Sequence, residues 1–362
     1  MSKSEIVNMT ATEMVRLIKT KGISASEVMD AHLSQINSVN PKVNAIVTIH
    51  PELGIDGAKL ADEAIAKGEN LGILHGLPTA HKDLVPTKGI RTTYGSPLYA
   101  DYIPDYSALI VERMQRAGAI TIGKTNTPEF GAGSQTYNEV FGETLNPYDT
   151  STTCGGSSGG AAVALATRMV PIADGSDTGG SLRNPANFCN VVGFRTSPGR
   201  VPTYPSKVGW SPTSVQGPMA RTVSDCALFL AAIAGPDSRV PISISEKGEV
   251  FLESLDRDFQ STKIAWSQDL GGLPIDPRTT AVIESQRSVF KDIGCLIVET
   301  EPDFSDVNEQ FLIWRGWGRE INQGDNLRNN RDKLKDTMIW DIEQGVKLSG
   351  PDVGWAEAKR ME

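Results

Sequence analysis

Two clusters rich in glycine and serine are the part of the chain whose residue types could do chemistry. The first is Cys-Gly-Gly-Ser-Ser-Gly-Gly-Ala-Ala-Val at 154–163, and the second is Asp-Gly-Ser-Asp-Thr-Gly-Gly-Ser-Leu-Arg at 174–183. Glycine lets backbone approach a ligand closely, so such loops often gather N–H groups that bind an anion. A flexible linker has a similar composition, but these clusters flank an apolar run rather than forming a tail. The clusters predict a serine-centred site with backbone oxyanion donors.

Ser157 lies in Gly-Gly-Ser-Ser-Gly at 155–159, which fits the G-x-S-x-G pattern of a nucleophile elbow. The α/β-hydrolases that carry this elbow need an acid and then a histidine later in the chain. All the histidines precede Ser157, at His32, His50, His75 and His81. The chain order therefore excludes an α/β-hydrolase.

A serine nucleophile still needs a base, and Lys82 is a candidate. It follows a strand-like segment in Gly-Leu-Pro-Thr-Ala-His-Lys-Asp at 76–83. A lysine buried at a strand end loses hydration, which favours its neutral, basic form. His81 is a rival base, but adjacent side chains of a strand point to opposite faces, so only one of the two would reach the site. The residues alone leave open which serine attacks.

The segment 118–125, Gly-Ala-Ile-Thr-Ile-Gly-Lys-Thr, satisfies the P-loop pattern for phosphate binding. A P-loop, however, is a loop between a strand and a helix. The alternation of Ile120 and Ile122 indicates that this segment is itself a strand. We therefore interpret the match as accidental.

The elements around these residues alternate between helix and strand. Thr10-x-x-Glu13 and Ser24-x-x-Glu27 are capping boxes that predict two opening helices. Further helices are expected at 57–67, 107–117, after Gly160 and at 222–234, and strands at 77–84, 119–122 and 169–173. Residues 236–261 are predicted to be an irregular connection, and 263–267, 277–293 and 295–299 to form strand, helix and strand. This alternation predicts an α/β fold with a central mixed β-sheet covered by helices on both faces.

The composition favours an ordinary globular enzyme. The chain has 362 residues, 39% of them hydrophobic and 22% charged, and a net charge of −9. That charge gives no basic surface for nucleic acid or an anionic membrane. The four cysteines form no Cys-x-x-Cys pair, the N-terminus has no signal-peptide core, and no apolar run reaches the length of a membrane span. We expect a cytoplasmic protein that needs no metal or cofactor.

Taken together, the motifs resemble the amidase signature family. The resemblance covers most of residues 10–235 and includes the spacing between Lys82 and the two serine clusters. Its matching segments are 76–83, Gly-Lys-Thr-Asn-Thr-Pro-Glu-Phe at 123–130, 155–160, 175–183, Val-Gly-Phe-Arg-Thr-Ser at 192–197 and Gly-Pro-Met-Ala-Arg-Thr-Val-Ser-Asp at 217–225.

The resemblance implies a Ser–cis-Ser–Lys triad in the amidase signature fold. Ser181 would attack the amide carbonyl and form an acyl-enzyme. Ser157, after a cis peptide bond, would relay the proton to neutral Lys82. The oxyanion hole would consist of the backbone N–H groups of Thr178, Gly179, Gly180 and Ser181.

The resemblance also assigns supporting residues and a domain layout. Ser158, Asp177 and Arg183 would support the site, and we select three aromatic residues as pocket candidates, Phe130, Tyr137 and Trp210. We expect residues 1–70 to form a helical segment packed on the core, 71–235 the signature core, and 236–362 a continuation of the same domain. Family members usually run on beyond this point, so we expect the chain to lack the C-terminal part of the fold.

The expected function is hydrolysis of an amide, anilide or carbamate, as in stand-alone amidases, aryl acylamidases and urethanases. Gln-Thr-Tyr-Asn at 135–138 differs from the Thr-Glu-Asn typical of tRNA-dependent amidotransferase subunits. Such a subunit, which supplies ammonia to a partner, remains the alternative, together with an inactive fragment. The expected partner is a small-molecule substrate, with a homodimer left open.

Overall fold

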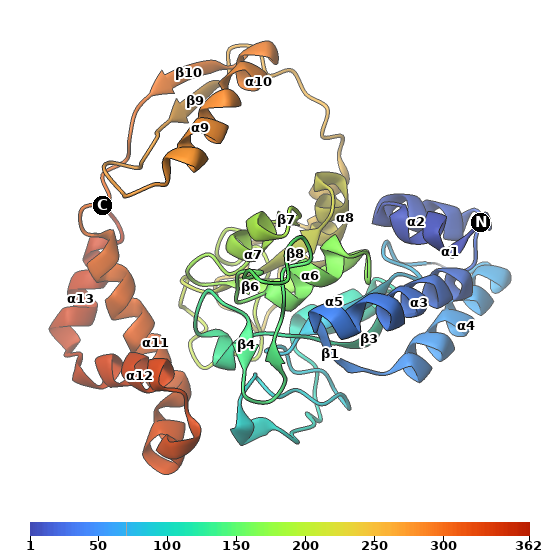
Figure 1. Cartoon of the computed structure of the whole chain (residues 1–362), viewed down its shortest axis with the longest axis horizontal. Helices are drawn as coiled ribbons and strands as arrows, with labels where there is room; N and C mark the ends of the chain where they lie inside the picture. The colour runs from blue at the N-terminus through green and yellow to red at the C-terminus, as the bar shows by residue number, and fades with distance from the viewer. Residues whose placement is uncertain (70) are drawn as a thin grey trace. The chain divides into compact units, whose positions relative to one another are not determined.

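The computed structural model describes residues 1–69 and 71–362 (Figure 1). Its helices of one α-helical turn or more are α1 (Lys3–Asn8), α2 (Ala11–Lys19), α3 (Ala25–Val43), α4 (Pro51–Lys67), α5 (Leu109–Arg116), α6 (Gly159–Ala166), α7 (Arg183–Phe188), α8 (Val223–Ile233), α9 (Pro277–Ser285), α10 (Arg287–Asp292), α11 (Val307–Asn330), α12 (Asp336–Lys347) and α13 (Gly350–Lys359). Its strands are β1 (Ile46–Ile49), β2 (Pro78–Lys82), β3 (Ile120–Thr125), β4 (Tyr137–Asn138), β5 (Gly142–Glu143), β6 (Ile172–Asp177), β7 (Val192–Gly193), β8 (Val215–Ala220), β9 (Lys263–Trp266) and β10 (Leu296–Glu299).

The N-terminal helices begin at side-chain caps. Thr10 caps α2, and Ser24 forms a complete capping box with Glu27 at the start of α3. The sequence predicted that helices begin at these two residues, and both predictions are confirmed. A short helix, α1, precedes them and was missed, although Ser2 and Glu5 form a capping box of the same kind. The helix predicted at 57–67 begins earlier, at Pro51, because proline suits the first turn of a helix.

A three-stranded mixed sheet, in the order β1-β3-β2, carries Lys82 at the end of β2. β2 is parallel to β3, and β1 is antiparallel to it. Helix α4 packs on β3 through glycines: a β-carbon at Gly54 or Gly57 would lie within 3 Å of Ile122 or Ile120. The close packing fixes β3, and through its ladder the position of β2.

The segment that matches the P-loop pattern is a strand, as predicted. β3 runs through Thr125, and Lys124 is fully buried in it. The Lys124 ammonium donates to the Val85 carbonyl and to the hydroxyls of Thr87 (3.1 Å) and Thr92 (3.2 Å). This lysine holds the 85–92 turn in place, and the segment is not a phosphate-binding loop.

A second three-stranded sheet, in the order β6-β8-β7, is antiparallel and carries the second serine cluster. The predicted strand at 169–173 is shifted along the chain to Ile172–Asp177, so it reaches into that cluster. Helix α6 packs on this layer with an almost wholly buried surface. The α/β class with mixed pairing is therefore present, but the strand ladders are divided among small sheets rather than forming one continuous sheet.

The chain divides into two compact units, Met1–Glu253 with Asp325–Trp340, and Ser254–Gly324 with Asp341–Glu362. All the predicted site residues belong to the first unit. The segment boundaries predicted at residues 70 and 235 stay predictions. Across the described residues, none of the helices combines the length and apolar character that crossing a membrane requires.

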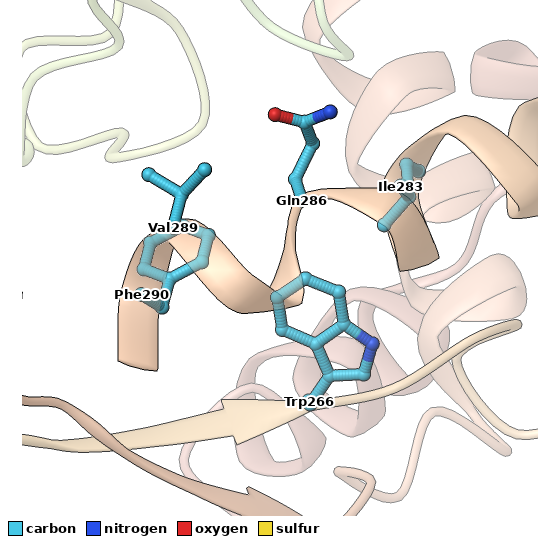
Figure 2. Close-up of a pocket in the computed structure, with 5 residues that line it drawn as sticks. All are labelled: Trp266, Ile283, Gln286, Val289 and Phe290. Carbon is cyan, nitrogen blue, oxygen red and sulfur yellow. The ribbon is translucent and has the colours of Figure 1, made fainter. Parts of the chain in front are cut away.

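The second unit contains the predicted strand–helix–strand pattern, with β9 and β10 parallel and paired from Lys263–Leu296 to Trp266–Glu299. The predicted single helix at 277–293 is divided into α9 and α10 at Gln286. Figure 2 shows the Trp266 indole of β9 directed toward these helices, where it lines a pocket of ≈ 490 Å³ with Ile283, Gln286, Val289 and Phe290. None of the predicted site residues lines this apolar pocket.

Candidate active site

The end of β2 directs Lys82 and His81 toward different groups, as the strand alternation predicts. Lys82 is fully buried, and its ammonium donates to the hydroxyls of Ser157 (2.8 Å), Ser158 (2.9 Å) and Ser176 (3.1 Å). His81 is also buried, but its Nδ1 lies 2.7 Å from Asp174 Oδ1. Of these two candidate bases, only Lys82 contacts the serine cluster.

Lys82 is therefore a buried amine in contact with three hydroxyls. Removing an amine from water disfavours its charged form. A serine oxygen can accept a hydrogen bond from a lysine and can also donate its own proton to a neutral amine. The arrangement can thus move a proton between a serine and Lys82 without solvent.

Ser157 and Ser158 lie at the start of α6, where glycine permits tight packing. The Gly156–Ser157 peptide bond is cis, as the family resemblance implies. Gly160, in the first turn of α6, faces the backbone that follows β3: a β-carbon there would lie 2.3 Å from Asn126 N and 2.7 Å from Ala45 O. Glycine at 160 lets the helix start approach β3 closely enough for its two serines to meet Lys82.

Ser181 lies beside this pair, and the backbone connects them. The Ser158 N–H donates to the Ser181 carbonyl at 3.2 Å. The Ser181 side chain is half-buried, and its hydroxyl makes no hydrogen bond to another residue within 1–69 and 71–362. No hydrogen bond joins the Ser157 and Ser181 hydroxyls among the described residues, so the contact that a proton relay would use stays a prediction.

The loop before Ser181 is wrapped around the buried carboxylate of Asp177. Asp177 accepts from the N–H groups of Gly180 (2.8 Å) and Leu182 (3.2 Å) and from the guanidinium of Arg183. Burial by itself raises the pKa of Asp177, but these hydrogen bonds and the charge of Arg183 lower it overall, to about 2. Asp177 is therefore ionised at neutral pH and holds the loop closed, while the supporting role of Asp177 and Arg183 in the chemistry stays a prediction.

The predicted oxyanion donors differ in availability. The Gly180 N–H is already donated to Asp177, so it is occupied in this conformation. The N–H groups of Thr178, Gly179 and Ser181 make no hydrogen bond within the described part of the chain. Gly180 has φ 113, a conformation that glycine adopts without strain, and this turn directs the loop past Ser181.

Sequence reasoning missed two residues of this site. Ser176 supplies the third hydroxyl to Lys82, and Arg195 donates to the carbonyl and, at 2.8 Å, to the carboxylate of Asp177. Both lie inside motifs that carried the family resemblance. The signal was therefore present as a motif, but nothing in the order of residues showed what either side chain contacts.

The three aromatic pocket candidates have different environments. Phe130 is buried, with ring centroids of Tyr94 and Tyr99 6.4 Å and 6.0 Å from its own. Its neighbour Gly131 borders the site, since a β-carbon there would lie 3.5 Å from Ser157 Oγ. Two candidates are exposed, Tyr137 at 53% and Trp210 at 75%. Phe130 is linked to the serine cluster through Gly131, and Tyr137 through its neighbour Thr136, whose hydroxyl donates to the Gly155 carbonyl at 2.8 Å.

The site has no features of a metal centre. Within residues 1–69 and 71–362, no group of three histidine, cysteine, aspartate or glutamate side chains is placed to hold a metal ion. The four cysteines are buried free thiols. Burial raises the pKa of Cys154, which is next to the first glycine pair, to about 12, so this thiol is not a nucleophile at neutral pH.

Comparison with known proteins matches residues 27–346 to the family model described as Amidase. An acylamidase of Rhodococcus erythropolis is 36% identical over 364 residues, which span 99% of this chain and 76% of the relative. One subunit of the glutamyl-tRNA(Gln) amidotransferase of Carboxydothermus hydrogenoformans is 41% identical over 295 residues, 82% of this chain and 61% of the relative.

The solved structures agree with the sequence comparisons. A bacterial aryl acylamidase of the amidase signature family superposes with a TM-score of 0.89 at 28% identity, over 98% of this chain and 75% of that one. The predicted amidase signature fold is thereby confirmed. The chain belongs to the amidase family of amide-hydrolysing enzymes.

Proposed function

We propose that this chain hydrolyses amide-type bonds with Ser181 as nucleophile, Ser157 as proton relay and Lys82 as base. The observation that carries the proposal is the 2.8 Å contact between the buried Lys82 ammonium nitrogen and Ser157 Oγ, beside a half-buried Ser181. The contact of His81 with Asp174 rather than with a serine further supports lysine as the base.

The reaction proceeds in two balanced halves. Ser181 Oγ bonds to the carbonyl carbon, its proton passes to Ser157, and the Ser157 proton passes to neutral Lys82. The oxyanion is bound by the N–H groups of the 178–181 loop. The C–N bond then breaks as the amine takes a proton back from Lys82 through Ser157, which leaves an acyl-enzyme. Water, activated by the same base, releases the carboxylic acid and restores Ser181.

We propose an acyl or leaving group with an apolar, aromatic part. The support is the aromatic cluster of Tyr94, Tyr99, Tyr102 and Phe130, whose neighbouring rings are 5.1 to 6.4 Å apart. Backbone of Gly131 joins this cluster to Ser157. Anilides and aryl carbamates fit such a surface, and one of the similar solved structures is an aryl acylamidase by name. Tyr137 and Trp210 remain predictions as pocket residues.

Fluorophosphonate labelling tests the triad. We expect the wild-type protein to be labelled at Ser181, Ser181→Ala to lose the label, and Lys82→Ala and Ser157→Ala to slow labelling by about 100-fold or more, the contribution of a general base. Ser224→Ala, an exposed hydroxyl on α8, is the matched control and should label normally. Equal labelling of Ser181→Ala and wild type would contradict the nucleophile assignment.

A substrate panel separates the two candidate functions. Acetanilide, an aryl carbamate, an aliphatic amide and glutamine would be offered to the purified chain. Turnover of the first two supports the hydrolase. The amidotransferase alternative, favoured by the 41% identity to an amidotransferase subunit, predicts glutamine turnover only with a co-purifying partner.

We further infer a reducing compartment such as the cytoplasm, with four free thiols as support. A homodimer is consistent with the proposal. Sedimentation velocity would detect it as twice the mass of the single chain. Thiol titration of freshly prepared, denatured protein should find all four cysteines, and disulfide-linked material would count against this location.

A further inference from the structure

We propose that His81 and Asp174 form a positioning pair that sets the base Lys82 against its serines. The inference rests on the proposed function, because it assumes that Lys82 is the base. Both side chains are fully buried and neither takes part in the triad chemistry. His81 contacts no serine in the described structure, so it does not remove the serine proton. We therefore look for another role for its buried contact with Asp174.

Asp174 divides its two oxygens between neighbouring residues of β2. Oδ1 lies 2.7 Å from His81 Nδ1, and Oδ2 accepts the Lys82 backbone N–H at 3.3 Å. We assign Nδ1 of His81 as the donor and the carboxylate oxygen as the acceptor of this contact. One carboxylate thus fixes both the main chain of Lys82 and the residue before it.

The same face of β6 also holds the other end of Lys82. Asp174 and Ser176 are two residues apart on β6, and residues so spaced in a strand project to the same face. Ser176 Oγ accepts from the Lys82 ammonium at 3.1 Å. β6 therefore anchors Lys82 at its backbone through Asp174 and at its amine through Ser176.

This anchoring is needed because β2 and β6 belong to different sheets. No strand ladder joins them among the described residues, so backbone pairing does not set their register. Side chains of β2 make the connection instead: Thr79 Oγ1 donates to the Ile172 carbonyl at 3.1 Å, and His81 bonds Asp174. His81 Nε2, at 3.0 Å from Thr121 Oγ1, also ties the ring to β3.

Two substitutions at His81 separate its two nitrogens. Asparagine places its amide nitrogen close to the position of Nδ1. His81→Asn therefore keeps a donor for Asp174 but loses the hydrogen bond to the Thr121 hydroxyl. Glutamine places its amide close to the position of Nε2. His81→Gln therefore keeps the hydrogen bond to the Thr121 hydroxyl but loses the contact with Asp174. We expect His81→Gln to lower kcat by about 10- to 100-fold with KM within twofold, the loss of a hydrogen bond to a charged group. His81→Asn should retain kcat within a few-fold.

Fluorophosphonate labelling of Ser181 supplies a second readout, and the labelling rate should fall in His81→Gln by the same factor as kcat. Asp174→Asn should fall at least as far, because its NH2 group replaces one of the two accepting oxygens and would face either the His81 ring or the Lys82 N–H, and it keeps the test decisive if His81→Gln does not fold. The matched control is His32→Gln, which removes Nδ1 contacts to the carbonyls of Arg168 and Met169 at another buried histidine. It should melt earlier but keep the wild-type kcat per folded molecule.

Equal kcat in His81→Asn and His81→Gln, whether both are normal or both are low, would overturn the positioning pair. A loss that tracks only the folded fraction measured by thermal melting would do the same. These outcomes are distinct from failure of the proposed function, because that failure appears as undiminished turnover in Lys82→Ala and Ser181→Ala.

Discussion

At the scale of residues, three serines that are distant in sequence from Lys82 share its buried amine. Ser157 and Ser158 come from the start of α6, and Ser176 comes from β6. Each serine fixes the amine from a different direction, so the Lys82 side chain has little freedom to leave Ser157. For Lys82 as the proposed base, we interpret this restriction as preorganisation, which lowers the cost of proton transfer.

Asp177 is the residue whose charge the loop depends on. Asp177→Asn should lower the free energy of unfolding by about 3–5 kcal/mol, since it leaves the cations of Arg183 and Arg195 without their buried partner. The carboxyl pKa of about 2 lies below its value in the unfolded chain, so the stabilisation is complete above about pH 4 and is lost as the pH falls through about 2. Urea unfolding of both proteins at pH 7 and pH 3 measures this difference.

The difference between the two proteins should be smaller at pH 3 than at pH 7. An equal difference at both pH values would show that the substitution acts through packing rather than through the charge. Arg278→Ala, at an exposed ion pair of the second unit, is the control and should change the stability little at either pH.

At the scale of elements, the close approach of α6 to the strand β3 determines where the two serines lie. Gly160→Ala should destabilise the protein by about 1–3 kcal/mol or more and reduce Ser181 labelling, because the added methyl group overlaps the Asn126 backbone, which cannot retreat without moving β3. Gly318→Ala in α11 is the opposite case, with nothing within 4 Å of the new methyl group. It should stabilise the helix by about 0.5–1 kcal/mol.

Thermal melting and labelling of both glycine variants test this pair. A Gly160→Ala protein that melts and labels like the wild type would contradict the proposed packing constraint on α6.

Helix α3 is connected to the turn after α6 by His32, which responds to pH. Burial, with a smaller effect of the Arg221 charge, lowers the pKa of His32 to about 4, although the carbonyls of Arg168 and Met169 oppose the shift. The unfolded chain takes up this proton near pH 6.5 and the folded chain does not. Stability from His32 is therefore complete above about pH 6.5 and falls as the pH drops toward 4, by an amount on the order of 3 kcal/mol.

His32→Asn retains a donor for the two carbonyls but has no titrating ring. Chemical unfolding between pH 4 and 7 should show a flatter dependence on pH for His32→Asn than for the wild type. Parallel curves would mean that His32 is not responsible for acid sensitivity in this range.

At the scale of the whole molecule, the proposed catalytic groups and the apolar pocket of Figure 2 belong to different units. Trp266→Ala should remove the packing of β9 on Phe290 and the hydrogen bond from the indole N–H to Glu284, at a cost of about 3–5 kcal/mol to the second unit. Because the site residues all lie in the first unit, labelling of Ser181 at 25 °C should be retained.

Differential scanning calorimetry with parallel labelling measures both effects in Trp266→Ala. Loss of labelling at a temperature where the first unit stays folded would show that the second unit supports the site. Val282→Ala, which removes an exposed side chain of α9, should change neither quantity.

The last stretch of the first unit could not be predicted from sequence. Asp325–Trp340 returns to this unit although the residues on both sides belong to the other. There the Lys335 N–H donates to the buried carboxylate of Glu129 at 3.1 Å, and its ammonium donates to the Ala132 carbonyl. The sequence shows no motif for this return, because a single backbone N–H carries no residue-specific signal.

The sequence by itself determined the residue types of the chemistry and the local elements that carry them. Capping boxes marked helix starts, alternation marked β3, and the absence of a histidine after Ser157 pointed to a lysine base. These features are local or depend on chain order, so they can be recognised from the amino-acid sequence alone. The roles of Ser181 and Ser157 remain predictions that rest on the family resemblance.

Tertiary structure alone decided which hydroxyls meet Lys82 and which groups are already engaged. Ser176 and Arg195 join the site, and Asp174 links two sheets, while the Gly180 N–H is taken by Asp177. Each of these facts depends on atoms brought within about 3 Å by the packing of separate strands, a condition set by the register of β2 against β6. No backbone ladder sets that register, so neither local propensity nor periodicity could have revealed it.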